Sequence, residues 1–165
     1  MFQTFDKSSP HARKLWMALL ARAPQPLLDA ALAEHTHMQP QWLRRPETGL
    51  MMVQGRVGGT GERFNLGEVT VTRCALRLHT AASDASVGVS YVLGRNHHQA
   101  RLAAVADALL QDPAQHAALE ASLLTPLREH LQAQHAARHA RAQTTKVDFL
   151  TVAREAGGDE EGDEA

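Results

Sequence analysis

The residues best suited to chemistry lie in a glycine-rich segment bounded by two arginines. Its members are Arg56, Gly58, Gly59, Thr60, Gly61, Glu62 and Arg63. Glycines adopt positive φ angles at little cost, which lets successive backbone N–H groups converge on one anion. Guanidinium groups on both flanks can hold phosphate oxygens through paired hydrogen bonds. The segment therefore fits either an anion-binding loop or a hairpin turn whose arginines are only solvated, and because turn glycines are common the residues by themselves favour the hairpin.

Known phosphate-binding motifs do not describe this segment. It lacks the Lys-Ser/Thr ending of a Walker A sequence, and a strand-like run follows it where that motif needs a helix. It also lacks the glycine spacing of a dinucleotide-binding fingerprint. Arg73 and Arg95 follow at the edges of other strand-like runs and add two further donors for an anion.

Histidines form a second set of candidates. His135 and His139 are four residues apart, so both would lie on one face of a helix and could bind a metal ion together. A zinc site needs three or four ligands, so the sequence favours a solvated helix and predicts no metal site. His97 and His98 precede an apolar helical stripe, where they are expected to be exposed or to touch an anion near Arg95.

The charge distribution narrows the class of partner. The formal net charge is −1, yet five acidic side chains lie in the last eight residues, which leaves 17 basic against 13 acidic side chains elsewhere. This mildly basic body suits an anionic ligand or an acidic protein surface. The arginines are scattered and aromatic residues make up only 4% of the chain, so no nucleic-acid partner is expected.

Length and composition predict one globular domain. The chain has 165 residues, of which 44% are hydrophobic, enough for a single core. We expect a single α+β domain over residues 1–155 and an acidic disordered tail over 156–165. Cys74 is the single cysteine, so no internal disulfide can form, which fits the cytoplasm. No signal peptide and no apolar run of about 18 residues is found, so no membrane span is expected.

Strand and helix patterns divide the chain into a sheet flanked by helices. Runs rich in Val, Thr, Leu and Met alternate with glycine-bearing breaks, which is typical of strands. The predicted strands cover residues 41–45, 50–57, 68–79 and 86–94. The breaks between them are short enough for hairpins. The expected fold class is α+β, an antiparallel meander of about four strands with N-terminal and C-terminal helices.

Helix boundaries are marked by capping residues and prolines. Ser9-Pro10 predicts the start of the first helix, and a second is expected over 27–35. Asp112-Pro113 should end the helix that follows Arg95, and Thr125-Pro126 should open a longer, histidine-rich one. Residues 146–154 are apolar and fit either a strand or a helix.

Alternation within the third predicted strand is uneven. Val69 and Val71 occupy odd-numbered positions, whereas Cys74, Leu76 and Leu78 occupy even-numbered positions. Because neighbouring strand residues face opposite sides of a sheet, a bulge near 72–73 would return these side chains to one buried face.

Six blocks of the sequence together resemble a known family. They are ETGL at 47–50, GGTGERF at 58–64, VTR at 71–73, SYVLGR at 90–95, DAL at 107–109 and KVDF at 146–149. In this order they resemble the G subunit of the bacterial carbon–phosphorus lyase system (the PhnG family), over about residues 11–154. The GGTGERF and YVLGR strings are the most specific. The acidic tail and the histidine-rich segment 130–143 lie outside the resemblance.

The resemblance implies a subunit of a larger assembly. Such G subunits are taken to assemble with H, I and J proteins, assisted by an L protein, so that bacteria can use alkylphosphonates as a phosphorus source. G, H and I are taken to exchange the adenine of MgATP for an alkylphosphonate, which yields α-D-ribose 1-alkylphosphonate 5-triphosphate; J later breaks the carbon–phosphorus bond. The glycosidic chemistry is assigned to I. No catalytic residue and no bound cofactor is therefore implied for this chain, and MgATP is a substrate of the complex.

These implied substrates fit the donors identified above, because a triphosphate and a phosphonate need arginines and backbone N–H groups. The candidates for a substrate-facing edge or a subunit contact are the segment from Arg56 to Arg63, with Arg73 and Arg95. Glu62 or Asp148 could stabilise positive charge on the ribose. The simpler interpretation pairs Glu62 with an arginine that fixes the loop.

The leading hypothesis is a cytoplasmic, non-autonomous subunit of the α-D-ribose 1-methylphosphonate 5-triphosphate synthase step. One alternative is a structural adaptor that stabilises the I subunit without touching substrate. The other is a free-standing anion-binding module.

Overall fold

The computed structural model describes residues 10–35, 38–80 and 83–146 of the chain. The chain divides into two compact units, residues 1–132 and 133–165. In the second unit the described part consists of the end of helix α5 (Thr125–Gln143) and a closing turn. The predicted helix start at Ser9, the 146–154 segment from residue 147 onward and the acidic tail lie outside the described residues. The proposed limits of the domain stay predictions.

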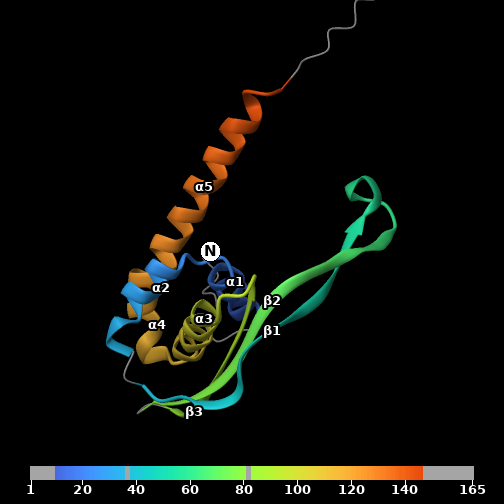
Figure 1. The fold of residues 1–165 in the computed structure, drawn as a ribbon. Helices are drawn as coiled ribbons and strands as arrows, with labels where there is room; N and C mark the ends of the chain where they lie inside the picture. The colour runs from blue at the N-terminus through green and yellow to red at the C-terminus, as the bar shows by residue number, and fades with distance from the viewer. Residues whose placement is uncertain (1–9, 36–37, 81–82, 147–165) are drawn as a thin grey trace, which may run out of the picture. The chain divides into compact units, whose positions relative to one another are not determined.

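The sheet of the first unit is a three-stranded antiparallel meander in the order β1-β2-β3 (Figure 1). Its strands are β1 (Gln41–Arg56), β2 (Arg63–Thr80) and β3 (Ser83–Leu93). Helices precede and follow it, which confirms the α+β class. Within the described residues the sheet has three strands and not four, because β1 contains both the first and the second predicted strands.

The predicted turn at residues 46–49 was wrong, and its place is taken by an irregularity within β1. Arg44 pairs with Ala75 and Glu47 pairs with Arg73, so β1 has one residue more than β2 at this point. Pro46 falls in this stretch. β1 is an edge strand, and a proline without an N–H is tolerated at an edge or a bulge. The strand therefore accommodates the proline and continues to pair with β2.

The bulge expected in β2 near 72–73 was also wrong. β2 pairs with β3 without interruption from Val71 to Leu78. Thr72 occupies the buried position that the apolar pattern lacked. Its hydroxyl donates to the carbonyl oxygen of Gly94 at 2.7 Å, which compensates for its burial.

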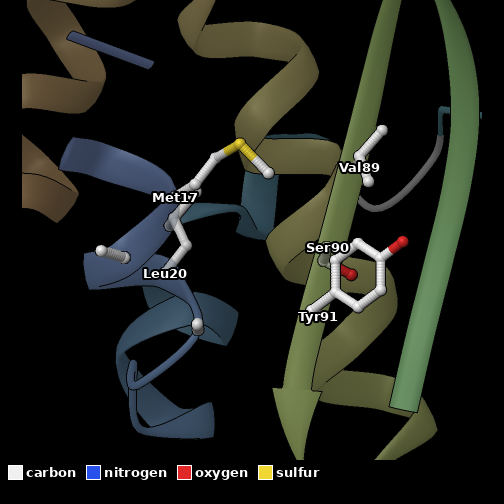
Figure 2. A pocket seen from close by; sticks show the side chains of 7 residues that line it. Met17, Leu20, Val89, Ser90 and Tyr91 are labelled. Atoms are coloured by element: carbon white, nitrogen blue, oxygen red, sulfur yellow. The ribbon is translucent and has the colours of Figure 1, made fainter. Parts of the chain in front are cut away.

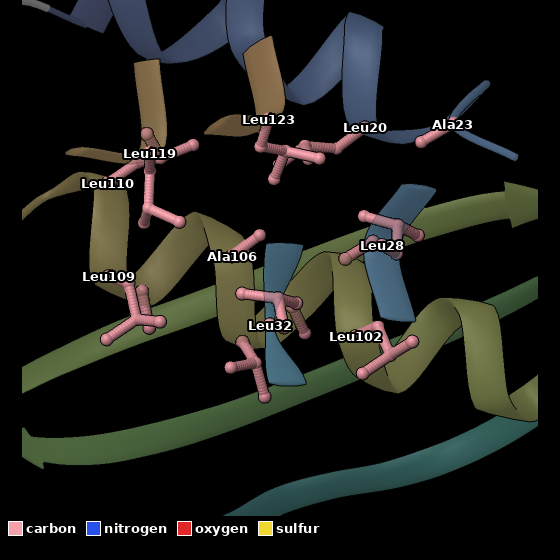
Figure 3. Close-up of a cluster of buried hydrophobic side chains, with 14 of the residues drawn as sticks. Leu20, Ala23, Leu28, Leu32, Leu102, Ala106, Leu109, Leu110, Leu119 and Leu123 are labelled. Atoms are coloured by element: carbon pink, nitrogen blue, oxygen red, sulfur yellow. The ribbon is translucent and has the colours of Figure 1, made fainter. Parts of the chain in front are cut away.

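Helix α3 (His97–Leu110) packs on one face of the sheet and forms the centre of the core (Figure 1). Its residues from Leu102 to Leu110 are all buried. Helices α1 (Pro10–Leu20), α2 (Gln25–Ala31) and α4 (Pro113–Leu119) surround it. Figure 3 shows leucines of these helices converging on α3. Three short segments complete the order: η1 (Ala33–His35), η2 (Val57–Gly59) and the π-helical η3 (Glu120–Leu124).

The contact between α3 and the sheet depends on small residues. A Cβ at Gly88 in β3 would lie 1.9 Å from the carbonyl oxygen of Ala104. The backbones of strand and helix are therefore closer here than any side chain would permit.

The ends of α3 follow the capping signals of the sequence. Asn96 accepts a hydrogen bond from the backbone N–H of Gln99 at 3.0 Å, which caps the first turn. Helix α3 ends just before Asp112-Pro113, as predicted, and Asp112 caps α4 by accepting from the N–H of Ala114 at 2.9 Å. Thr125 opens α5, also as predicted. None of the helices in the described ranges has the length and apolar character needed to cross a membrane.

Candidate functional site

The glycine-rich segment forms the tip of the β1–β2 hairpin. β1 ends at Arg56, η2 follows over Val57–Gly59, and β2 begins at Arg63. Gly58 has φ 58° and ψ 16°, and Gly59 has φ 83°. These left-handed backbone conformations strain any residue with a side chain, so the turn itself requires glycine at both positions.

Part of the donor set expected for an anion is used to close the turn. The N–H groups of Thr60 and Gly61 both donate to the carbonyl oxygen of Val57, the latter at 2.8 Å. The N–H of Val57 donates to the carbonyl oxygen of Glu62 at 3.2 Å. The predicted cradle of converging N–H groups therefore loses the contributions of Thr60 and Gly61. If an anion binds at this tip, the arginine side chains are therefore its main donors.

The two flanking arginines are brought together. Arg56 and Arg63 are directly opposite each other in the β1–β2 pairing, and both are exposed. One guanidinium nitrogen of Arg56 donates to the carbonyl oxygen of Gly61 at 3.1 Å, which holds that side chain over the turn. Glu62 is exposed and forms no ion pair with any residue that the structure describes. Within the described residues no ion pair of Glu62 holds the loop, and a pairing of Glu62 with an arginine stays a prediction.

Arg73 belongs to a different cluster, on the outer face of the sheet. Its Nε donates to Oε1 of Glu47 at 2.7 Å, and Arg44 donates to the same oxygen at 2.5 Å. The hydrogen bond from Arg73, and then the one from Arg44, lower the pKa of Glu47 below its ordinary value. Sequence reasoning placed Glu47 in a family block but gave it no role, because the predicted turn at 46–49 hid its pairing with β2.

Arg95 lies at a third place, between the end of β3 and the cap of α3. Beside it runs a chain of hydroxyl contacts: Nε2 of His97 is 2.9 Å from Oγ1 of Thr48, which is 3.2 Å from Oγ1 of Thr72. His97 is thus bound to β1, whereas His98 forms an ion pair with Asp29 of α2 at 2.7 Å. The two histidines tie the start of α3 to the sheet and to α2.

The nine candidate residues therefore do not form one site. Arg63 and Arg73 lie on the same strand, ten positions apart, which corresponds to about 30 Å at ~3.3 Å per residue. The N–H of Gly94, next to Arg95, donates to the carbonyl oxygen of Thr70, seven positions from Arg63. The hairpin tip unites Arg56, Arg63 and the residues between them. Arg73 and Arg95 are too distant to share a phosphate with it.

A buried carboxylate escaped the sequence analysis. Asp107 of α3 is fully buried, and its oxygens accept from Arg13, from Nε1 of Trp16 at 2.9 Å and from the N–H of Val89 at 2.9 Å. This arrangement joins α1, α3 and β3. The signal was present in the sequence as a single acid within the otherwise apolar run 102–110, which predicts a buried carboxylate with several donors.

A small pocket lies between α1 and β3 (Figure 2). Its volume is about 210 Å³, and Met17, Leu20, Val89, Ser90 and Tyr91 line most of it. The hydroxyl of Ser90 is already used, since it donates to the carbonyl oxygen of Ala100 at 2.6 Å. The pocket is smaller than the roughly 300 Å³ from which ligand sites usually start, and it has no charged lining residue. It suits no triphosphate.

Metal binding has no support within the described ranges. No three His, Cys, Asp or Glu side chains of residues 10–35, 38–80 and 83–146 come together in a way that could hold an ion. In α5, a ring nitrogen of His139 is 3.3 Å from the side-chain amide of Gln143.

Comparison with known proteins identifies the family. Residues 11–155 match the family described as phosphonate metabolism protein PhnG. The chain belongs to the PhnG family. The match contains the hairpin tip, the Glu47 cluster and Asp107, and it stops where the acidic tail was predicted to begin. A curated member from Rhizobium meliloti (strain 1021), named alpha-D-ribose 1-methylphosphonate 5-triphosphate synthase subunit PhnG, is 39% identical over 155 residues. The alignment covers 92% of this chain and 95% of that PhnG protein.

Proposed function

We propose that this chain is a subunit of an α-D-ribose 1-methylphosphonate 5-triphosphate synthase within the carbon–phosphorus lyase system. The observation that carries the proposal is the 39% identity, over nearly the whole of both chains, to a protein that bears this name. In this role the chain works in the cytoplasm with H, I and J subunits, assisted by an L protein. The complex exchanges the adenine of MgATP for an alkylphosphonate, a transferase reaction.

The chain contributes to this reaction without performing it alone. Its described residues offer cationic donors at the hairpin tip, an apolar pocket of about 210 Å³ and a carboxylate buried beyond the reach of solvent. A glycosidic exchange needs a carboxylate or water-activating group beside the ribose, together with a cavity that holds a nucleotide. Another subunit supplies these in the proposed complex.

At the hairpin tip, Arg63 is the residue best placed to face an anion. It is exposed, and its guanidinium is directed to no partner among the described residues, whereas Arg56 is held by Gly61. A triphosphate brought to the tip by a partner would be bound by Arg63 through paired hydrogen bonds. In the second candidate role, as a structural adaptor, the tip would contact only protein.

The experiment that separates the two roles uses the reconstituted complex. Arg63→Ala is assembled with the H, I, J and L proteins, and adenine release from MgATP and methylphosphonate is measured. Normal assembly with adenine release reduced by roughly 100-fold supports the substrate-facing role, since a lost phosphate contact costs about that much. Failure to assemble supports the adaptor. If the Arg63→Ala complex assembles fully and is fully active, Arg63 contributes neither to substrate binding nor to assembly. A wild-type chain that never joins the complex contradicts the proposed function.

A further inference from the structure

The β1–β2 hairpin has one face that points away from α3. In β2 the even-numbered positions, such as Thr72 and Leu76, are buried against the helix, and the odd-numbered positions, such as Arg73, face outward. Directly opposite residues of antiparallel strands project to the same side of a sheet. The pairing of Gly49 with Val71 therefore places both on the outward face, and the same holds for the pairs that follow toward the tip.

This outward face is apolar over the whole distal part of the hairpin. From the pair of Gly49 with Val71 to the pair of Gly55 with Phe64, every outward position is either glycine or apolar. We call it the outer stripe, and its side chains are Met51, Val53, Phe64 and Val69, with Leu93 of β3 beside them; Val71, at the inner end of the same face, is buried. Met51 is 44% exposed, Phe64 45% and Leu93 69%.

No second layer of the described structure covers the outer stripe. β3 pairs with β2 only from Val71 onward and Gly94 hydrogen-bonds to Thr70, so the part of β2 over residues 63–69 has β1 as its single neighbouring strand. Figure 1 shows this part of the hairpin extending beyond α3. A two-stranded ribbon is marginally stable in water without a hydrophobic layer on one face. An uncharged apolar face on such a ribbon is therefore typical of a surface that another protein covers.

The charges at the two ends of the stripe indicate what kind of protein fits. The tip carries Arg56 and Arg63 against Glu62; the Arg56–Arg63 pair projects to the side opposite Phe64, so these charges lie beyond the end of the stripe and not on its face. At the other end Arg44 and Arg73 share the single carboxylate of Glu47. Both ends therefore have an excess of positive charge, and the stripe between them has none.

A second copy of this chain would fit poorly on the outer stripe. Two stripes packed face to face bring either tip against tip or tip against the Arg73 cluster. Both arrangements oppose like charges, which disfavours the contact. A partner surface that is apolar at its centre and bordered by carboxylates is complementary to the stripe and to the positive charge at each of its two ends.

We propose that the outer stripe is the docking surface for another subunit of the synthase, one that presents an apolar patch bordered by acidic side chains. This inference rests on the proposed function, because it supposes that the chain is part of a complex. Docking there covers the apolar face of the ribbon and fixes its direction. It thereby determines where the partner meets the hairpin tip with Arg63.

The test compares charges placed on the two faces of the same strand. Met51→Glu puts a carboxylate on the outer stripe, and Leu50→Glu puts one on the opposite face, where Leu50 is 65% exposed. Each full-length variant is co-expressed with the H, I and J proteins. Co-elution and the dissociation constant are then measured, with circular dichroism as the check on folding. Met51→Glu should weaken association roughly 30-fold or more, as expected for a residue central to an interface, and Leu50→Glu by less than about twofold.

A steric variant makes the test independent of charge. An added Cβ at Gly49 meets no atom within 4 Å, so Gly49→Trp should fold normally while its ring covers the end of the stripe next to the Glu47–Arg73 pair. It should weaken association as Met51→Glu does. Raising the salt concentration should also weaken wild-type association, because the bordering charges are exposed.

The outcomes distinguish this inference from the proposed function. A wild-type complex that Met51→Glu and Gly49→Trp leave intact overturns the docking surface alone, and a wild-type chain that joins no complex overturns both. If the isolated chain forms a dimer that Met51→Glu dissociates, the occupant is a second copy and the proposal is wrong. Association that does not change with salt contradicts the acidic border.

Discussion

Asp107 and Arg13 are 94 positions apart in the sequence, yet the carboxylate of Asp107 accepts both a 2.7 Å and a 3.2 Å hydrogen bond from the guanidinium of Arg13. The same guanidinium donates to the carbonyl oxygen of Val87 at 2.9 Å. One ion pair therefore joins the first helix, the central helix and the last strand. Its carboxylate is wholly buried, so its contribution to stability is open to a direct test.

Asp107→Asn should destabilise the protein by about 3 kcal/mol. The substitution removes the charge that Arg13 needs and turns an amide N–H₂ toward groups that are themselves donors. The measurement is the urea midpoint of unfolding, followed by circular dichroism. Asp29→Asn is the matched control, since its ion pair with His98 is exposed and its loss should move the midpoint far less. Equal shifts for the two variants would contradict the structural role given to Asp107.

Two glycines of the sheet should respond in opposite ways to the same change. Gly88→Ala drives a methyl group into the carbonyl of Ala104 and should cost about 3 kcal/mol or more, because strand and helix must separate. Gly49→Ala adds its methyl group in open space and should leave the stability unchanged within about 0.5 kcal/mol. Thermal unfolding of both variants provides the comparison. A Gly88→Ala protein as stable as Gly49→Ala would show that β3 and α3 are not in such close contact.

Acid should weaken the Glu47 cluster in a defined pH range. The pKa of Glu47 is lowered in the folded protein, so its ion pairs contribute stability above its ordinary pKa of 4.5, and this contribution is lost as the pH falls below that value through the folded pKa. Glu47→Gln should therefore lower stability at pH 7 and lose its effect as the pH falls below 4.5 and through the folded pKa. Urea titrations at a series of pH values would show the two proteins converging in acid. A stability difference between the two proteins that stays constant across the pH series would exclude the ionised Glu47 as the source of that difference.

Cys74 should be inert toward thiol reagents while the protein is folded. Burial raises the pKa of the Cys74 thiol to about 11, although the charge of Arg101 partly opposes the shift. At pH 8 very little thiolate is present, and the side chain is shielded from solvent. Modification by a chromogenic disulfide should thus follow unfolding and accelerate in urea. Rapid reaction of the native protein would mean that the β2–α3 contact opens readily.

Local signals in the sequence predicted the helices better than the sheet. Asp112-Pro113 marked a real helix boundary, because capping and proline geometry depend on neighbouring residues alone, and Thr125-Pro126 marked the point where η3 continues into α5. The number of strands was wrong since Pro46 and Gly49 look like a turn. Whether a proline ends a strand depends on its position at an edge, and only the pairing with β2 reveals that.

In the candidate site, too, local features were predicted well and long-range contacts were not. The hairpin tip was recognised correctly as a glycine turn between arginines, since those residues are contiguous in the sequence. Arg73 and Arg95 were grouped with it on residue type, but strand length separates them from it. The partner of Arg73 is Glu47, 26 positions away, and a contact of that range requires the register of the strands.

The free edge of β3 has a consequence for the behaviour of the protein at high concentration. Arg13 and Gln111 both donate to the carbonyl oxygen of Val87, and the N–H of Val89 donates to Asp107. These backbone groups are the ones through which an incoming strand would extend the sheet. Because side chains of two helices already occupy them, this margin of the fold resists edge-to-edge aggregation, and substitutions at Arg13 or Gln111 would make fibril growth easier.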